Sequence, residues 1–298
     1  MIEVTGPFLN EMQGVFGPLP IDPIPDGEIH RFQIPGDKPG SRNGWYVLYG
    51  DGLPAGAFGS WKLGNSFNWS ARGGFDAAEQ EAFQRRLEDA RRRRAKALEG
   101  RQTQAATIAL DTWKRARPAS NSHPYLLSKM MPQLNLRQLG ATLLVPLVDI
   151  NFTLVNLQRI SPQGGKRFLP NGRVSGCFSP IGRINPNGEL FICEGWATGA
   201  AIYQATGIPV ACAMNCGNLK AVAQALRNKF PGVAITVAGD DDRNTPGNPG
   251  RTKAVQAAAL TRSQLVFPAG YCRPDCDCTD FNDLYCCGQR AGAGGLQA

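Results

Sequence analysis

The sequence predicts a chain of mixed α/β and α+β class. A small β-rich region comes first, a long basic helix follows, and a basic region of strands and turns leads into a Rossmann-like parallel sheet. Three observations predict this order: an opening rich in Gly, Pro and aromatic residues, an abrupt polar and basic run from residue 76, and an alternation of strand and helix patterns from Gly188. Such alternation is typical of a parallel sheet with helices on both faces.

Composition limits the classes of protein that the chain can be. It has 298 residues, 42% of them hydrophobic, and a formal net charge of +8, which favours a globular protein with a polyanionic partner, nucleic acid first. No export signal opens the sequence, and the apolar run Leu143 to Val148 is too short to span a bilayer. We therefore expect a cytoplasmic protein without membrane contact, whose nine cysteines stay reduced.

Residues 1–75 predict a small antiparallel sheet, with Asp51-Gly52 as a hairpin turn. The strand-like runs are Ile29 to Ile34, Trp45 to Tyr49, Ala55 to Trp61 and Phe67 to Ala71. Their aromatic residues suit either a small core or a platform on which single-stranded bases stack.

Residues 76–120 predict a long basic helix, because Gly is almost absent and Phe83, Leu87 and Ala90 recur at helical spacing. The basic turn Arg91 to Arg94 suits either a nucleic-acid backbone or a solvated helix face.

Residues 121–187 return to strands and turns, and residues 188–298 alternate between strand and helix. The expected strands of this last region are Leu190 to Cys193, Pro209 to Ala213, Val233 to Ala238 and Gln264 to Pro268. The helices expected between them are Thr198 to Ala205, Asn218 to Phe230 and Arg251 to Thr261.

Carboxylates follow several of these strands. Glu194 ends one strand, Asp240–Asp242 end another, and Asp280 and Asp283 come after the last. Ligands of such sheets bind beyond the carboxyl ends of the strands, so we expect these side chains to converge. Oxygen ligands without a nearby histidine suit Mg²⁺ or Mn²⁺ better than zinc. A solvated acidic loop remains the alternative for the three aspartates.

The combination of Glu194-Gly with the later "GDDDR" resembles the TOPRIM domain of topoisomerases and primases. The resemblance to its D-x-D-R motif implies that Asp240 and Asp242 are the metal pair, with Asp241 in the variable middle position. It also implies that Asp280 is a further metal ligand, and that Glu194 either binds metal or relays a proton.

Residues 123–290, from "HPYLLSK" onwards, resemble the catalytic core of bacterial-type DNA primases of phages and plasmids. The resemblance implies a basic subdomain before TOPRIM, in which Arg159, Lys166 and Arg167 face template and incoming nucleotide, and it implies that Arg243 also binds nucleic acid or nucleotide. It implies synthesis of short RNA primers on a single-stranded DNA template from NTPs, with Mg²⁺ or Mn²⁺.

The chain departs from that family in two respects. Its first cysteine is Cys177, so an N-terminal zinc ribbon is missing, and no GxxxxGK[ST] motif is present, so a replicative helicase would be a separate chain. Zinc is not expected at the late cysteines either, because they lack paired C-x₂-C spacing. Those cysteines are Cys272, Cys276, Cys278, Cys286 and Cys287. Two rival functions are a TOPRIM nuclease and a non-catalytic single-stranded-DNA-binding replication module.

Overall fold

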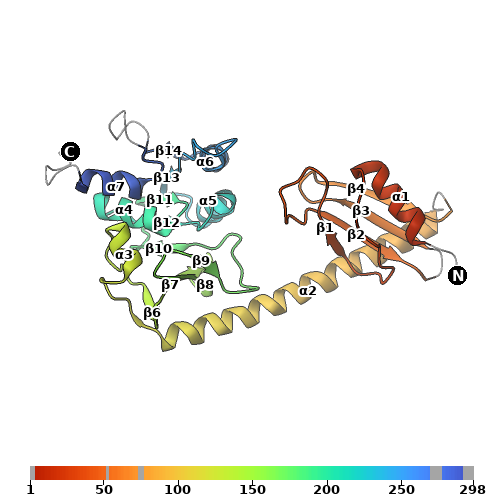
Figure 1. Cartoon of the computed structure of the whole chain (residues 1–298), viewed down its shortest axis with the longest axis horizontal. Helices are drawn as coiled ribbons and strands as arrows, with labels where there is room; N and C mark the ends of the chain where they lie inside the picture. Colours follow the sequence, from red (N-terminus) through yellow and green to blue (C-terminus); the bar gives the residue numbers. More distant parts are fainter. Residues whose placement is uncertain (1–3, 52–53, 73–76, 269–276, 291–298) are drawn as a thin grey trace. The chain divides into compact units, whose positions relative to one another are not determined.

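A computed structural model describes residues 4–51, 54–72, 77–268 and 277–290. They form two compact units, residues 1–99 and 100–298, and helix α2 (Ala77–Arg115) contributes its first part to one unit and its last part to the other (Figure 1). The finer division into four regions stays a prediction.

The first unit is an antiparallel sheet covered by a helix on each face. Its strand order is β1-β2-β3-β4, with helix α1 before it in the sequence. The bounds are α1 Thr5–Phe16, β1 His30–Phe32, β2 Gly44–Tyr49, β3 Ala55–Ser60 and β4 Asn65–Ser70. Phe8 and Met12 of α1 pack on one face, and Phe83 and Leu87 of α2 pack on the other. Every residue of β2 and β3 is therefore buried.

The four strands are as expected, and helix α1, which was not predicted, precedes them. Most aromatic residues here build the core, and Trp45 and Tyr46 are buried. Trp61 and Phe67 are exceptions, with 51% and 37% of their surface exposed.

The predicted face of α2 is confirmed, since Phe83, Leu87 and Ala90 are all buried. Within the basic turn, Arg92 pairs with Asp89 at 3.3 Å and Arg93 with Glu28 at 3.3 Å. These contacts are those of a solvated helix face, and binding to a nucleic-acid backbone stays a prediction.

The second unit begins with a basic subdomain built on an antiparallel sheet of order β5-β6-β7-β8-β9. Its elements are β5 Arg117–Pro118, α3 Pro124–Lys129, β6 Arg137–Leu139, β7 Thr142–Val148, β8 Leu154–Ile160 and β9 Lys166–Phe168. One face packs against the end of α2 through Leu144 and Leu157. The other face, which carries Leu143, Val145 and Ile160, belongs to the core shared with the parallel sheet.

The predicted parallel sheet is confirmed, in the order β10-β12-β11-β13-β14. Its strands are β10 Ser179–Ile181, β11 Glu189–Cys193, β12 Val210–Cys212, β13 Ala234–Ala238 and β14 Gln264–Val266. Its helices are α4 Trp196–Thr206, η1 Cys216–Asn218, α5 Leu219–Lys229, α6 Pro249–Thr261 and α7 Phe281–Arg290. Only β10, at the edge, runs antiparallel to its neighbour within this sheet. Figure 1 shows α4 and α7 on one face and α5 and α6 on the other.

One hydrophobic core joins the basic subdomain to the parallel sheet. Tyr125 and Leu126 of α3 pack in the same cluster as Leu143 of β7, Trp196 of α4 and Ala238 of β13. A shared core of this kind fixes the two sheets relative to each other. Among the described helices, none combines the length and apolar character needed to cross a membrane.

Candidate active site

Two carboxylates leave the parallel sheet side by side. Strands β11 and β13 are hydrogen-bonded neighbours in which Cys193 is paired with Ala238. Glu194 and Asp240 follow these paired residues by one and two positions, so both lie at the carboxyl edge of the sheet. The predicted convergence of these two acids is therefore a direct consequence of the strand register.

Asp280 reaches the same edge from the far end of the chain. The backbone N–H of Asp241 donates to the carbonyl of Thr279 at 2.8 Å, which ties the segment before α7 to the aspartate turn. Asp280 immediately precedes α7, and its Oδ1 accepts from the N–H of Asp283 at 2.8 Å. Capping by Asp280 satisfies a helix N–H that would otherwise lack a partner.

Asp240 carries the strongest electrostatic signal of the cluster. Burial, together with the charges of Glu194, Asp280 and Asp242, raises its pKa from 3.8 to about 8. Its Oδ1 is buried and, among the described residues, has no hydrogen-bond partner. A buried carboxylate oxygen without a donor is costly unless a cation or proton compensates it.

The neighbouring acids are perturbed in the same direction. Burial raises the pKa of Glu194, and Asp242 raises it further, whereas the backbone N–H of Cys216 and the charge of Lys166 lower it. Burial also raises the pKa of Asp280, which the N–H of Asp283 partly offsets. The negative charges of these carboxyl groups therefore repel one another, and each raises the pKa of its neighbours.

Asp242 differs because a helix terminus stabilises it. Its Oδ2 accepts from the N–H of Gly250 at 2.8 Å, in the first turn of α6, where the helix dipole favours negative charge. A Cβ on Gly250 would lie 2.8 Å from that oxygen and 2.9 Å from the carbonyl oxygen of Asp240. Glycine at this position is therefore required for the close approach.

Asp241, the middle aspartate, points to a different set of partners. Its Oδ1 accepts from Asn248 Nδ2 at 2.7 Å, and its carboxylate pairs with Arg243 at 3.5 Å and Arg251 at 3.8 Å. Arg243 also donates to the carbonyl of Cys278 at 2.9 Å. Asp241 thus links the aspartate turn to the start of α6 by hydrogen bonds and ion pairs. Arg243, which was predicted to bind nucleic acid or nucleotide, takes part in these contacts.

Strand register separates the predicted basic residues. In β9, Lys166 is paired with Ile160 of β8, whereas Arg167 is paired with Arg159. Adjacent residues of a strand point to opposite faces, so Lys166 and Arg167 lie on opposite faces of the sheet. Arg159 and Arg167 share the face of Leu144, which is paired with Arg159 in β7.

Lys166 does lie within the field of the acids, and so does a residue that the sequence analysis missed. Desolvation lowers the pKa of the Lys166 ammonium and Lys129 lowers it further, although the side chain as a whole is exposed. Asp280, Glu194 and Asp240 act in the opposite direction. Lys129 also lowers the pKa of Asp280. Two lysines therefore accompany the acidic cluster.

The carboxylate oxygens of these acids are of the kind that Mg²⁺ prefers, but few of the side chains are arranged around one point. No group of three His, Cys, Asp or Glu side chains in the described part of the chain is arranged to hold one ion. Mg²⁺, however, is commonly held by one or two carboxylates, with water and substrate phosphates completing its shell. The unpartnered oxygen of Asp240 fits such an ion, and the ligand set Glu194, Asp240, Asp242 and Asp280 stays a prediction.

The late cysteines do not enlarge this site. Cys272 and Cys276 lie outside the described residues. Cys278 and Cys286 are buried, Cys287 is half-buried, and Cys286 lies on α7 with its Sγ 3.4 Å from the carbonyl oxygen of Lys129. That helix was itself missed, although Phe281, Leu284 and Tyr285 have the i, i+3, i+4 spacing that predicts one.

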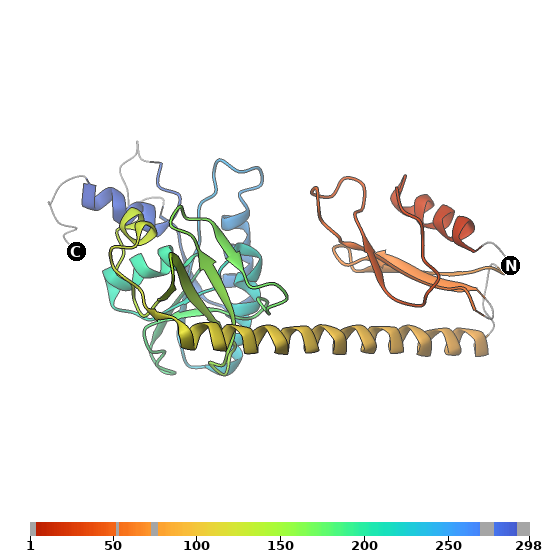
Figure 2. The same cartoon turned by 60° about the horizontal axis from the view of Figure 1, so that its bottom comes forward.

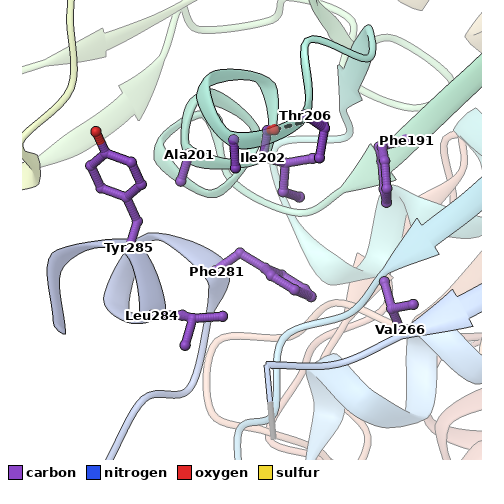
Figure 3. A pocket seen from close by; sticks show the side chains of 9 residues that line it. Phe191, Ala201, Ile202, Thr206, Val266, Phe281, Leu284 and Tyr285 are labelled. Atoms are coloured by element: carbon purple, nitrogen blue, oxygen red, sulfur yellow. Dashed lines mark hydrogen bonds between the residues drawn. The ribbon is translucent and has the colours of Figure 1, made fainter. Parts of the chain in front are cut away.

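An apolar pocket of about 330 Å³ lies between α4 and α7, and none of the acids lines it. Figure 3 shows Phe281, Leu284 and Tyr285 of α7 facing Ala201, Ile202 and Thr206 of α4, with Phe191 and Val266 from the sheet. The hydroxyl of Thr206 donates to the carbonyl of Ile202 at 2.8 Å. Without a charged lining residue, this pocket offers no ligand for a metal or a phosphate.

Comparison with known proteins points in the same direction as the site. Residues 189–290 match the family described as the Toprim domain. Two proteins of Escherichia coli, each described as DNA primase TraC, are 36% identical over 274 residues and 35% identical over 258 residues. The matches cover 87% and 83% of this chain, but 26% and 18% of the relatives. The chain therefore spans about a quarter or less of their length.

Among solved structures, the chain resembles the primase fragment of the bacteriophage T7 primase-helicase protein. The TM-score is 0.43 at 15% identity, with 57% of this chain and 70% of that chain covered.

A parallel sheet with an acidic carboxyl edge, matched over residues 189–290, defines a Toprim-domain protein. The matches to the two TraC proteins extend far upstream of that domain. Residues 189–290 are thus a Toprim domain, within a chain that is similar over most of its length to proteins described as DNA primase TraC, which confirms the resemblance stated from its motifs.

Proposed function

We propose that the chain acts as a DNA primase, joining NTPs into short RNA primers on a single-stranded DNA template. The observation that carries the proposal is the cluster around Asp240, a buried carboxylate within the charges of Glu194 and Asp280, one oxygen of which has no hydrogen-bond partner in the described part of the chain. Phosphoryl transfer depends mainly on positioning and on charge stabilisation, and a cluster of this kind is suited to both.

Asp240, Asp242 and Asp280 are the residues that would hold Mg²⁺ or Mn²⁺ in this proposal. When bound, the ion would neutralise the negative charge of the phosphates and of the acids together. Glu194 would help hold it or move a proton, because burial raises the pKa of its carboxyl above that of an exposed glutamate.

The basic residues divide into two groups in this proposal. Lys166, within the field of the acids, neutralises the triphosphate of the incoming nucleotide. Arg159 and Arg167, on the opposite face of their sheet, contact a nucleic-acid backbone. A helicase on a separate chain and a cytoplasmic location complete the proposal, both as expected from the sequence.

The experiment is primer synthesis on single-stranded DNA with labelled NTPs and either Mg²⁺ or Mn²⁺. We expect short RNA products from the wild type and none from the double variant Asp240→Asn/Asp242→Asn, which keeps side-chain size while removing two charges. Circular dichroism would verify that the double variant is folded. Products that persist in this variant would exclude the proposed role of the acids.

The same reactions distinguish the rival functions. Metal-dependent shortening of the DNA, without RNA products, would indicate a TOPRIM nuclease. Binding of single-stranded DNA with neither synthesis nor cleavage would indicate a non-catalytic replication module. Either result would overturn the primase assignment.

A further inference from the structure

Lys129 ends helix α3 at the junction between the basic subdomain and the parallel sheet. The following residue, Met130, has a φ of 52° and closes the helix in the left-handed conformation. The carbonyl of Lys129 accepts from Asn282 Nδ2 at 2.9 Å, and Asn282 is fully buried in α7. The backbone of Lys129 is therefore hydrogen-bonded to α7, the helix that follows Asp280.

The other side of α3 contacts strand β9. Tyr125 is buried, and the Lys166 ammonium lies 5.8 Å from the centre of its ring, a cation–π contact. In Figure 2, α3 lies beside α7, in agreement with the hydrogen bond between them. One short helix thus connects the strand that carries Lys166 to the helix that follows Asp280.

Neither ammonium makes an ion pair within 4.0 Å among the described residues, although both lie within the field of the acids. Lys129 is half-buried and lowers the pKa of Lys166, so the two cations oppose each other. Repulsion between like charges of this kind is unfavourable. An anion between the lysines and the acids, with a metal ion on its acidic side, would relieve both repulsions.

We propose that Lys129 binds the triphosphate of the incoming NTP together with Lys166, opposite the carboxylates. The inference rests on the proposed primase function and adds a phosphate-binding residue to it. Lysine suits this position because it presents a compact charge with three donors to phosphate oxygens. The anchoring bond is made by the Lys129 backbone, so a side-chain substitution leaves the attachment of α3 to α7 in place.

Binding without turnover tests the inference directly. The probes are an ATP analogue that cannot react at its α-phosphate, and adenosine, which has no phosphate. The variants are Lys129→Met, which keeps the apolar stem, and Lys129→Arg, which keeps the charge. Lys229→Met is the matched control, since Lys229 is exposed in the last turn of α5, at the opposite end of the sheet.

We expect Lys129→Met to raise the Kd for the ATP analogue about tenfold, an effect of the size of one charge-assisted hydrogen bond. Affinity for adenosine and for single-stranded DNA should not change, and the control should match the wild type. Lys129→Arg should restore binding of the analogue to within about threefold. In primer synthesis, Lys129→Met should raise KM for NTP, with a smaller effect on kcat.

The outcomes distinguish the role of Lys129 in phosphate binding from the proposed primase function. If the wild type makes primers but Lys129→Met binds the analogue as tightly as the wild type, the inference is wrong and the primase function stands. If the wild type binds no nucleotide at all, both are wrong. Equal weakening for the analogue and adenosine would assign Lys129 to the structure of α3 and overturn its role in phosphate binding.

Discussion

Replacing Asp240 with Asn should stabilise the metal-free protein at alkaline pH. The fold places this carboxylate among the charges of Glu194, Asp280 and Asp242, and its pKa rises from 3.8 to about 8 as a result. A carboxyl with a raised pKa in the folded state favours the protonated form. Protonation of Asp240 therefore contributes fully to the free energy of unfolding of the wild type below about pH 4. This contribution is lost as the pH rises towards 8.

The size of the effect follows from the pKa. If Asp240 alone accounted for the change from 3.8 to about 8, ionising it in the fold would cost about 6 kcal/mol. The acids titrate as a coupled set, however, so protonation of one carboxyl relieves the others. We therefore expect Asp240→Asn to raise the free energy of unfolding by ~2–3 kcal/mol at pH 8, and by far less at pH 5.

Urea unfolding at pH 5 and pH 8, in the presence of EDTA, would measure this difference by linear extrapolation. The comparison of variant with wild type at each pH isolates the titration of residue 240 from that of other groups. Added Mg²⁺ should then cancel most of this difference, because an ion at 100 times its Kd stabilises the wild type by about 2.7 kcal/mol and the variant much less. A variant that is less stable than the metal-free wild type at pH 8 would refute the reasoning.

Three further predictions concern the residues around the acids. Asp241→Ala should lower the free energy of unfolding by about 1–2 kcal/mol, measured by urea unfolding, whereas Asp241→Asn should lose less because it keeps an acceptor for Asn248. Gly250→Ala should cut primer synthesis at least tenfold by displacing Asp242, and it should also lower the melting temperature, since the new Cβ would lie 2.9 Å from the backbone carbonyl oxygen of Asp240. Arg159→Ala and Arg167→Ala should each reduce the salt dependence of single-stranded-DNA binding by about one unit of slope, without altering KM for NTP.

The parallel sheet and its acidic edge could be predicted because the relevant signals are local. Strands β11 and β13 are short apolar runs, each followed by carboxylates, and parallel strands place their carboxyl ends together. The separation of Lys166 from Arg167 could not be predicted in the same way, because it depends on which residue of β8 each one faces. Lys129 became visible as a site residue only through the packing of α3 against α7.

Helix α1 shows a second limit of sequence reasoning. Thr5–Phe16 contains two glycines and a proline, and it lies in a region whose composition is typical of strands and turns. The helix is nevertheless formed, with Phe8 and Met12 fully buried against the sheet of the first unit. Tertiary packing of one apolar face outweighs weak helix propensity in such a segment.

The three adjacent aspartates present three equal charges in the sequence, and the fold gives each a different environment. Asp241 is compensated by Arg243 and Arg251, and Asp242 by the N–H of Gly250. The repulsion that remains is concentrated on Asp240, whose buried oxygen has no partner among the described residues. Because only one of the three is left uncompensated, the repulsion that opposes folding is confined to a single carboxyl, the one at which the proposed cation would bind.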